Sequence, residues 1–481
     1  MSTTNKNNMH YIHCAVFFVL LFIFRLVPPI GTITEVGMQV LSVFIGLIYG
    51  WIFLGFAWPS LFGLLALGMT DYYGGVTAAV CDGFSQSMVW QVFFMLLFAG
   101  ILKQLGLTEF IGHWLLSRKI CQGKPWVLTA MIFIASVLCG GLITMFASIF
   151  MIWAIFYDIA KTCGLQKGDK YVGFVSVGVV FFVVVSSLVF PFRPFPYMVL
   201  GLIKGTGVTT MPMMPWLITG LITIGSMIAL WMLIGKFILR IDLSPMKNID
   251  LSEILKSEKM NNDQKIGLAM LLIMSLVLLL PSICPTTWPI IALFKKWDLV
   301  GIALILICVA FLLRKKDGTA LSDMQRLSKE VNWDLVFMFA VTLPLGTALE
   351  SGEVGVIATV MSVLVPIFNG VSPIVFIVGS LLLFGSLTQV AHNLVLMMVF
   401  TPVLAGLCVN YGIPPLLYAF CLAVILQCAF MTPAASAPAA VIFSNTEWMT
   451  QKQAYGYTAM IVLSGFLVIC CIMLPVGLLL F

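Results

Sequence analysis

Arg193 is a charged residue inside an apolar stretch, residues 190–202, that also contains three prolines. Pro191, Pro194 and Pro196 cannot belong to one straight helix, because proline lacks a backbone donor and fixes φ. Non-helical backbone at membrane depth is tolerated only where it is buried in protein or lines a cavity. We therefore expect Arg193 to hold a carboxylate, sulfate or phosphonate through its guanidinium fork. The alternative is that it hydrogen-bonds free carbonyls of the broken helix and touches no ligand.

A second stretch, residues 431–444, repeats this arrangement. Its two prolines have the spacing of the outer pair in the first stretch, and a short apolar segment follows each pair. A broken membrane helix in each half of a chain is the best sequence indication of a transporter binding site. Helices that open at the breaks would add partial positive charge, which favours an anion. Tyr197 and Ser436 stand at these places and are further candidates for substrate binding.

Polar side chains gather around His392 in the second half of the chain. Its imidazole could donate to an anion, or take a proton and so replace a cation in coupling. The alternative is a neutral histidine packed against its own hairpin. Short polar side chains suit a small polar solute, and the neighbours of His392 are Ser386, Thr388, Gln389 and Asn393. Thr144 and Ser148 form the counterpart in the first half, among more apolar neighbours.

The carboxylates, cysteines and histidines argue against other chemistries. Asp158 lies one turn before Lys161, as expected of an ion pair at the membrane boundary, and no carboxylate falls in a broken helix or beside His392. This argues against a proton antiporter that titrates a core aspartate. The 12 cysteines are scattered without a CxxC motif, and we expect them to be small hydrophobic residues rather than metal ligands. Three of the four histidines (His10, His13, His113) lie near helix ends, so an intramembrane enzyme is not expected.

Composition places these residues in a polytopic membrane protein. Of the 481 residues, 61% are hydrophobic and 9% are charged, whereas a soluble chain carries about 25% charged residues. The polar N-terminus shows no cleavable-signal pattern, and we expect the apolar run after it to be the first spanning helix. No basic soluble domain is present, so membrane lipid is an expected partner and nucleic acid is not.

We expect an all-α fold: an inverted repeat with about eleven spanning helices, two re-entrant hairpins and two discontinuous helices. The expected elements of the first half are helices near 11–28, 36–56, 57–71 and 90–116, a hairpin at 125–161, a broken helix at 171–206 and a helix at 214–236. The expected elements of the second half include helices near 266–283 and 299–313, and a further helix from Trp333. Polar loops are expected at 70–88 and 236–265, and around Lys295 and Lys296.

Charge distribution and repeated landmarks predict the orientation. Cytoplasmic loops collect Lys and Arg, and placing the N-terminus inside puts most of the 25 basic residues there and the C-terminus outside. Three pairs of landmarks recur at a nearly constant separation: Trp90 with Trp333, Thr144 with Thr388, and Pro191 with Pro433. By this topology Trp90 starts an inward helix and Trp333 an outward one, so the repeat is inverted. Chance matching between apolar segments is the alternative.

In these motifs the chain resembles the divalent anion:sodium symporters, the dicarboxylate, citrate and sulfate carriers of the ion-transporter superfamily, as a divergent member. The likeness runs from about residue 36 to the end. Residues 98–107 are similar to the family's "fGG…L…GL" helix, and residues 431–443 are similar to its "mlPvATPPNAIVF". The resemblance implies a homodimer that works by an elevator mechanism. It also implies scaffold parts at 1–124 and 241–370, and transport parts at 125–240 and 371–481.

The chain departs from this family in its ligand motifs. The family's Ser-Asn-Thr signature supplies oxygens to sodium and hydrogen bonds to a substrate carboxylate, and here residues 147–149 and 392–394 replace it. Residues 194–197 and 436–439 replace the family's Thr-Pro-Pro-Asn. Residues 444–446 spell the signature past the second broken helix, which we interpret as coincidence. The residues predicted to bind substrate are Thr144, Arg193, Tyr197, Thr388, His392, Asn393 and Ser436. The implied sodium positions are Gly141, Thr144, Ser148, Gly385, Asn393 and Ala435.

These observations predict a secondary active transporter of a small anion, resembling a di- or tricarboxylate or sulfate, with Na⁺ as the coupling ion and a bacterial cytoplasmic membrane as its location. An anion exchanger, or a proton-coupled permease for a monoanionic or neutral solute, is the alternative if the sodium sites are lost. A homologue that binds without transporting, as a sensor, is a third hypothesis.

Overall fold

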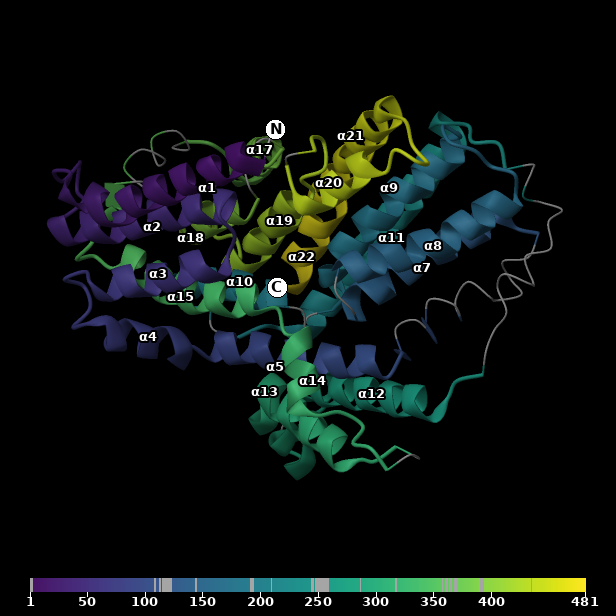
Figure 1. Ribbon diagram of the computed structural model, residues 1–481, viewed down its shortest axis with the longest axis horizontal. Coiled ribbons are helices and arrows are strands. Elements are labelled where there is room, and N and C mark those ends of the chain that lie inside the picture. Colours follow the sequence, from purple (N-terminus) through teal and green to yellow (C-terminus); the bar gives the residue numbers. More distant parts are fainter. Residues whose placement is uncertain are drawn as a thin grey trace.

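The computed structural model is built from helices (Figure 1). It describes residues 3–107, 110–111, 114, 123–142, 145–190, 194–208, 210–243, 246, 259–285, 287–315, 318–356, 358–359, 362, 366, 370–389, 393–433 and 435–481. Within these residues there is no strand, only an isolated bridge between Arg314 and Ala320. In the same residues nine helices are long and apolar enough to cross a membrane, or ten if the bent pair α14 and α15 is one span. The prediction of an all-α polytopic membrane protein is confirmed.

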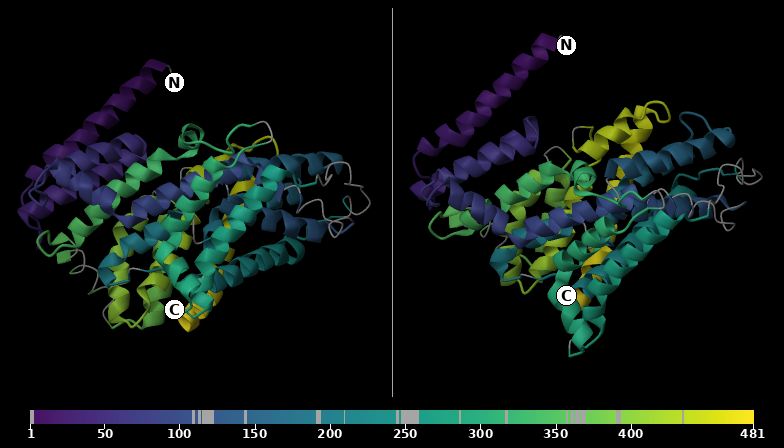
Figure 2. Two further views of the ribbon diagram at one scale, coloured as in Figure 1. Left: turned by 90° about the horizontal axis from the view of Figure 1, so that it is seen from below. Right: turned by 60° about the horizontal axis from the view of Figure 1, so that its bottom comes forward.

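The first five helices form one side of the molecule (Figure 1). Their bounds are α1 Thr3–Phe18, with its extensions η1 Val19–Ile23 and η2 Phe24–Leu26, α2 Glu35–Phe53, α3 Ala57–Gly68, α4 Val76–Ser85 and α5 Ser87–Gln104. Figure 2 shows α1 reaching away from the other helices, and this helix is largely exposed. The loop expected at 70–88 instead contains α4. Gly83 explains its position, because a Cβ there would overlap the Ala340 carbonyl oxygen, so only glycine lets α4 lie directly against α15.

The first predicted hairpin packs with α9, η4 and α11 as a second group, whereas α10, after the break, packs against α5 and α19 (Figure 1). Their bounds are α7 Pro125–Leu142, α8 Met145–Thr162, α9 Lys170–Val184, η4 Val185–Leu188, α10 Pro194–Leu202, η5 Lys204–Thr206, α11 Met213–Leu233 and η6 Ile234–Ile238. Apolar on every side, α9 is almost wholly buried, as expected for a helix enclosed by others. Tyr171 of α9 hydrogen-bonds Thr129 of α7 at 2.8 Å between their hydroxyl oxygens.

The middle of the chain supplies α12 Asn262–Ile283, α13 Pro289–Leu312, α14 Met324–Glu330 and α15 Trp333–Glu350. Lys295 and Lys296 were expected in a loop but belong to α13. The helix is kinked at Asp298, whose φ is 49°. The Asp298 carboxylate accepts the backbone N–H of Val300 at 2.7 Å, so it caps the part of the helix that follows the kink.

The last third of the chain contains α17 Pro373–Leu387, α18 Asn393–Asn410, α19 Pro415–Gln427, α20 Ala437–Ser444, α21 Gln451–Val468, η8 Ile469–Met473 and α22 Leu474–Leu480. Helical structure stops at both predicted breaks, before α10 and before α20. Here too a tyrosine of the broken helix bonds the first helix of the predicted hairpin before it, because the hydroxyl oxygens of Tyr418 (α19) and Ser380 (α17) lie 2.7 Å apart.

Two tryptophans close short helices in the same way in the two halves. The indole N–H of Trp90 donates to the Phe84 carbonyl at 2.7 Å, where α4 ends. The indole N–H of Trp333 donates to the Ser328 carbonyl at 3.2 Å, near the end of α14. Each tryptophan thereby satisfies a carbonyl that has lost its intrahelical partner. Such matched contacts are expected of related halves, and the inverted relation between them stays a prediction.

Close helix packing in the second group depends on Gly220 of α11. A Cβ there would overlap the Leu188 carbonyl oxygen of η4. Gly220→Ala should therefore force α11 and η4 apart and lower the free energy of unfolding by about 1–3 kcal/mol or more. Thermal unfolding of the purified protein measures this. Gly225→Ala in the same helix is the matched control, because a Cβ there meets no atom within 4 Å. Equal melting temperatures for the two variants would contradict the prediction.

Candidate substrate and ion site at the helix breaks

The break between α19 and α20 is held by Gln389, which follows the end of α17. Its side-chain amide donates to the carbonyls of Gly385 at 2.9 Å and Cys428 at 3.1 Å. Its side-chain oxygen accepts the backbone N–H groups of Phe430 at 3.1 Å and Met431 at 3.0 Å. One glutamine thus satisfies several backbone groups that the helix has left without partners. The expected second hairpin tip and the second break therefore form one bonded unit.

Three hydroxyls reinforce this unit. The Thr388 hydroxyl donates to the Leu426 carbonyl at 3.0 Å, and the Thr432 hydroxyl to the Gln389 carbonyl at 2.8 Å. The Ser436 hydroxyl donates to the Ala429 carbonyl at 2.6 Å and accepts the Ala439 N–H, so Ser436 is the N-cap of α20. Thr388 and Ser436 were predicted to bind substrate. In the structure both hydroxyl protons are already given to the backbone, so they brace the break.

The first break is defined by its flanks, because residues 191–193 lie outside the described residues. Phe190 precedes it and packs on Gly141 of α7, where a Cβ would overlap the phenyl ring. Ser148 of α8, predicted to bind a cation with Gly141, is fully buried. The helix α10 begins immediately after the break at Pro194, and its N-terminal amides carry partial positive charge. Close packing against Phe190 is therefore sufficient to explain why position 141 is a glycine.

Buried polar atoms without a partner flank both breaks. Among the described residues these include the Ser186 hydroxyl oxygen in η4, the Tyr197 hydroxyl in α10 and the Gln427 side-chain nitrogen at the end of α19. Their helices are in contact, because α19 packs on both α10 and η4. A buried polar group without a hydrogen bond costs about 1–3 kcal/mol, so each of these atoms is a candidate partner for a bound water or a polar solute. Tyr197, predicted from sequence, is in this group, and it is 3% exposed.

The other predicted residues divide into two sets. Thr144, Arg193 and His392 lie outside the described residues. Asn393 is the first residue of α18 and is half-buried, while Gly385 and Ala435 are placed at the second tip and second break. The Gly385 carbonyl accepts from Gln389, and Ala435 is 1% exposed with its N–H bonded to the Thr432 carbonyl at 3.1 Å. Within the described residues, no group of three or more His, Cys, Asp or Glu could hold a metal ion.

Sequence reasoning gave little weight to Gln389 and missed Gln427 and Ser186. Gln427 stands directly before the second break, as Ser186 stands shortly before the first, so a search for polar residues on the N-terminal side of each break would have found them. No sequence signal shows that Gln389 spans the break, because its partners lie about forty residues later in the chain and are set by packing.

Residues 444–446 spell a family signature but are not at a hairpin tip. The Asn445 side chain donates to the Tyr157 hydroxyl of α8, and Ser444 to the Val441 carbonyl of its own helix at 3.0 Å. Trp448 stacks on Tyr157 with ring centroids 4.6 Å apart. These residues join the first hairpin to the loop after α20 and lie apart from the break braced by Gln389.

The described residues form an all-helical body with nine or ten candidate membrane spans and a helix that stops at a break in each half, an arrangement typical of membrane transporters. The chain belongs to the citrate transporter family, whose sequence model matches residues 14–425. It is similar to the sodium-dependent dicarboxylate transporter SdcS of Staphylococcus aureus, in strain USA300 and in strain COL alike, at 27% identity over 172 residues. That alignment covers 34% of this chain and 32% of the relative. The expected relationship to the dicarboxylate and citrate carriers is confirmed.

Removal of the glutamine that spans the break tests its role. Gln389→Met keeps the approximate size of the side chain but leaves buried N–H and C=O groups unbonded, each at a cost of about 1–3 kcal/mol. We expect a clearly lower melting temperature of the purified protein. Gln427→Met is the matched control, because its side-chain nitrogen has no partner among the described residues. A Gln389→Met protein as stable as Gln427→Met would show that the break does not depend on this residue.

Proposed function

We propose that this chain is a secondary active transporter of a small di- or tricarboxylate, or of a sulfate-like anion, bound between the two helix breaks. The observation that carries the proposal is the group of buried, unpartnered polar atoms on Ser186, Tyr197 and Gln427, which flanks both breaks. Membership of the citrate transporter family supports it, as does the name of the dicarboxylate relative. Neutral donors can hold any polar solute, and a positive charge beside them would favour an anion.

Arg193 is the residue proposed to supply that charge, because it directly precedes α10 in the sequence. A guanidinium binds a carboxylate through two parallel N–H groups. The N-termini of α10 and α20 begin at the breaks and would add partial positive charge. In this proposal Tyr197 and Gln427 donate to the remaining oxygens of the anion, and Asn393, His392 and Thr144 approach from the tips.

Sodium is the proposed coupling ion, on the strength of the sodium-dependent relative. Its ligands would be oxygens at the tips and breaks. The same proposal includes the expectations made from the sequence: an elevator mechanism, a homodimer, the membrane orientation and a bacterial location. One observation favours the alternative of exchange or proton coupling. At the second tip the Gly385 carbonyl oxygen already accepts one hydrogen bond, which makes it a weaker sodium ligand, and His392 offers a titratable group nearby in sequence.

Thermal stabilisation distinguishes these couplings. We expect citrate or succinate to raise the melting temperature of the purified protein more in sodium than in choline, because anion and cation bind together. Arg193→Ala should melt like the parent protein but lose the anion-dependent shift. A shift in melting temperature that is as large in choline as in sodium, and that depends on pH near 6–7, would indicate coupling through protonation of His392. No shift with any di- or tricarboxylate or sulfate, together with no uptake into proteoliposomes, would overturn the proposed function.

The Tyr197 hydroxyl gives a test confined to one atom. Tyr197→Phe removes a buried hydroxyl that has no partner within the described residues, so stability should be unchanged or higher. Loss of one hydrogen bond to the solute should raise the KM of uptake about two- to tenfold. Tyr171→Phe is the control, because its hydroxyl is bonded to Thr129 and its loss should lower stability without changing KM. An unchanged KM in Tyr197→Phe would remove this residue from the site.

A further inference from the structure

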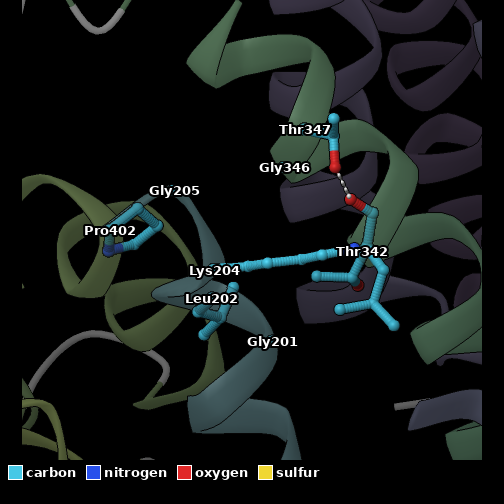
Figure 3. Close-up of a pocket in the computed structure, with 9 residues that line it drawn as sticks. Gly201, Leu202, Lys204, Gly205, Thr342, Gly346, Thr347 and Pro402 are labelled. Atoms are coloured by element: carbon cyan, nitrogen blue, oxygen red, sulfur yellow. Dashed lines mark hydrogen bonds between the residues drawn. The ribbon is translucent and has the colours of Figure 1, made fainter. Parts of the chain in front are cut away.

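A pocket of about 220 Å³ lies away from the braced break, at the end of α10 (Figure 3). Three segments line it: residues 201–205 from α10 and η5, residues 342–347 of α15, and Pro402 of α18. By the domain assignment expected from sequence, α10 and α18 belong to transport parts and α15 to a scaffold part. The pocket therefore lies where the two kinds of part would meet. Its volume suits a small metabolite rather than a larger ligand.

Lys204 gives this pocket its charge. The other lining residues are glycine, leucine, threonine and proline, so no carboxylate lines the pocket. Figure 3 shows the Lys204 side chain reaching from η5 toward α15. In the part of the chain that the structure describes, Lys204 makes no ion pair, whereas Lys103, Lys315 and Arg326 each do. An ammonium group in a pocket without a counter-ion attracts an anion.

The exposed side chain of Lys204 contacts the first member of a chain of hydrogen-bonded polar groups. Its ammonium donates to the Gln86 side-chain oxygen at 3.4 Å. The Gln86 amide donates to one oxygen of Asp82 at 3.0 Å, and the Tyr73 hydroxyl donates to the other at 2.6 Å. Burial, followed by the nearby Asp82 carboxylate, raises the pKa of Tyr73 well above its usual value, so the phenol stays a donor. Lys204 is thus linked to α4 through one long hydrogen bond, and Gln86 stands between its ammonium and the Asp82 carboxylate.

The threonines of the pocket do not compete with Lys204 for an anion. The Thr342 hydroxyl donates to the Met338 carbonyl at 2.6 Å, and the Thr347 hydroxyl to the Leu343 carbonyl at 3.2 Å. Both protons are thus directed along their own helix. A solute in the pocket would be held by one positive charge and by packing, without a second charged contact. Such binding is weaker than a bidentate arginine pair, as suits a site that a solute passes through.

We propose that this pocket is a second anion subsite, an entrance vestibule in which Lys204 binds one carboxylate of the solute before or after the helix-break site. Gln86 and Asp82 are its positioning residues. The identity of the solute rests on the proposed function. The site itself does not, because the pocket and its positive charge are formed by residues other than those of the helix-break site. Since Gln86 lies in an expected scaffold part and Lys204 in a transport part, their contact would also change when the parts move.

Site-resolved acylation of lysines tests the pocket without transport. The purified protein is treated with an amine-acylating reagent in citrate or in chloride of equal ionic strength, and peptide mass spectrometry gives the rate at each lysine. We expect citrate to slow acylation of Lys204 at least threefold and to leave Lys295 of α13 unchanged. Protection should persist in Arg193→Ala, which lacks the proposed charge of the main site. Equal rates at Lys204 with and without citrate, or protection that disappears in Arg193→Ala, would overturn the vestibule.

Uptake kinetics in proteoliposomes give the second measurement. Lys204→Gln should raise KM for the anion at least fivefold with Vmax within about twofold, and Lys204→Arg should restore KM because the charge returns. Gln86→Leu should raise KM by a smaller factor, and Lys295→Gln is the matched control with KM unchanged. A normal KM in Lys204→Gln would overturn the vestibule. If the parent protein transported none of the anions, the proposed function would be wrong. The acylation experiment would still show whether Lys204 binds an anion in the pocket.

Discussion

Backbone polar groups at a helix break inside a membrane must find partners within the protein, because lipid offers none. The structure meets this constraint at the second break with Gln389 and three hydroxyls. Those side chains reach the break from two sides: the end of α17 and the segment that leads to α20. The break is therefore braced on its polar side, because these side chains give their protons to backbone carbonyls.

Some polar side chains therefore brace the break and others are available to a solute, and residue type alone does not distinguish the two roles. Thr388 and Ser436 have the residue types of ligand donors, yet their protons are bonded to carbonyls. Tyr197 and Gln427 have less obvious positions, yet they carry buried polar atoms without partners among the described residues. Recognition is thus better assigned to the unpartnered atoms, and rigidity to the bonded ones. Because a preorganised site loses less entropy on binding, the braces contribute to affinity without contacting the solute.

Composition and proline spacing predicted the membrane fold and both helix breaks, because these depend on local properties of the chain. The role of Gln389 could not be predicted, since its partners are fixed by packing between elements distant in sequence. The helix α4 was missed because its position depends on the absence of a side chain at Gly83 against α15. Lys204 was not singled out from the sequence, where it falls at the end of the expected broken helix 171–206, and only the pocket and the Gln86–Asp82 relay distinguish it from Lys295.

A second set of contacts bears on how the proposed transport parts would move. Asn445 and Trp448, which follow α20, bond to and stack on Tyr157 of α8, and Lys161 lies over the Trp448 ring at 5.8 Å. Near them, the Gln453 side chain of α21 donates to the Gly168 carbonyl at 2.6 Å. The first hairpin and the last helices are thus joined by aromatic and polar contacts, although they come from opposite halves of the sequence.

By contrast, Lys204 meets Gln86 through one long hydrogen bond. Motion between parts is easier where contacts are few and polar than where rings stack. At the proposed vestibule α10 also packs against α5 and α15, so the Lys204–Gln86 bond, rather than this packing, is the contact that a charged solute in the pocket would displace.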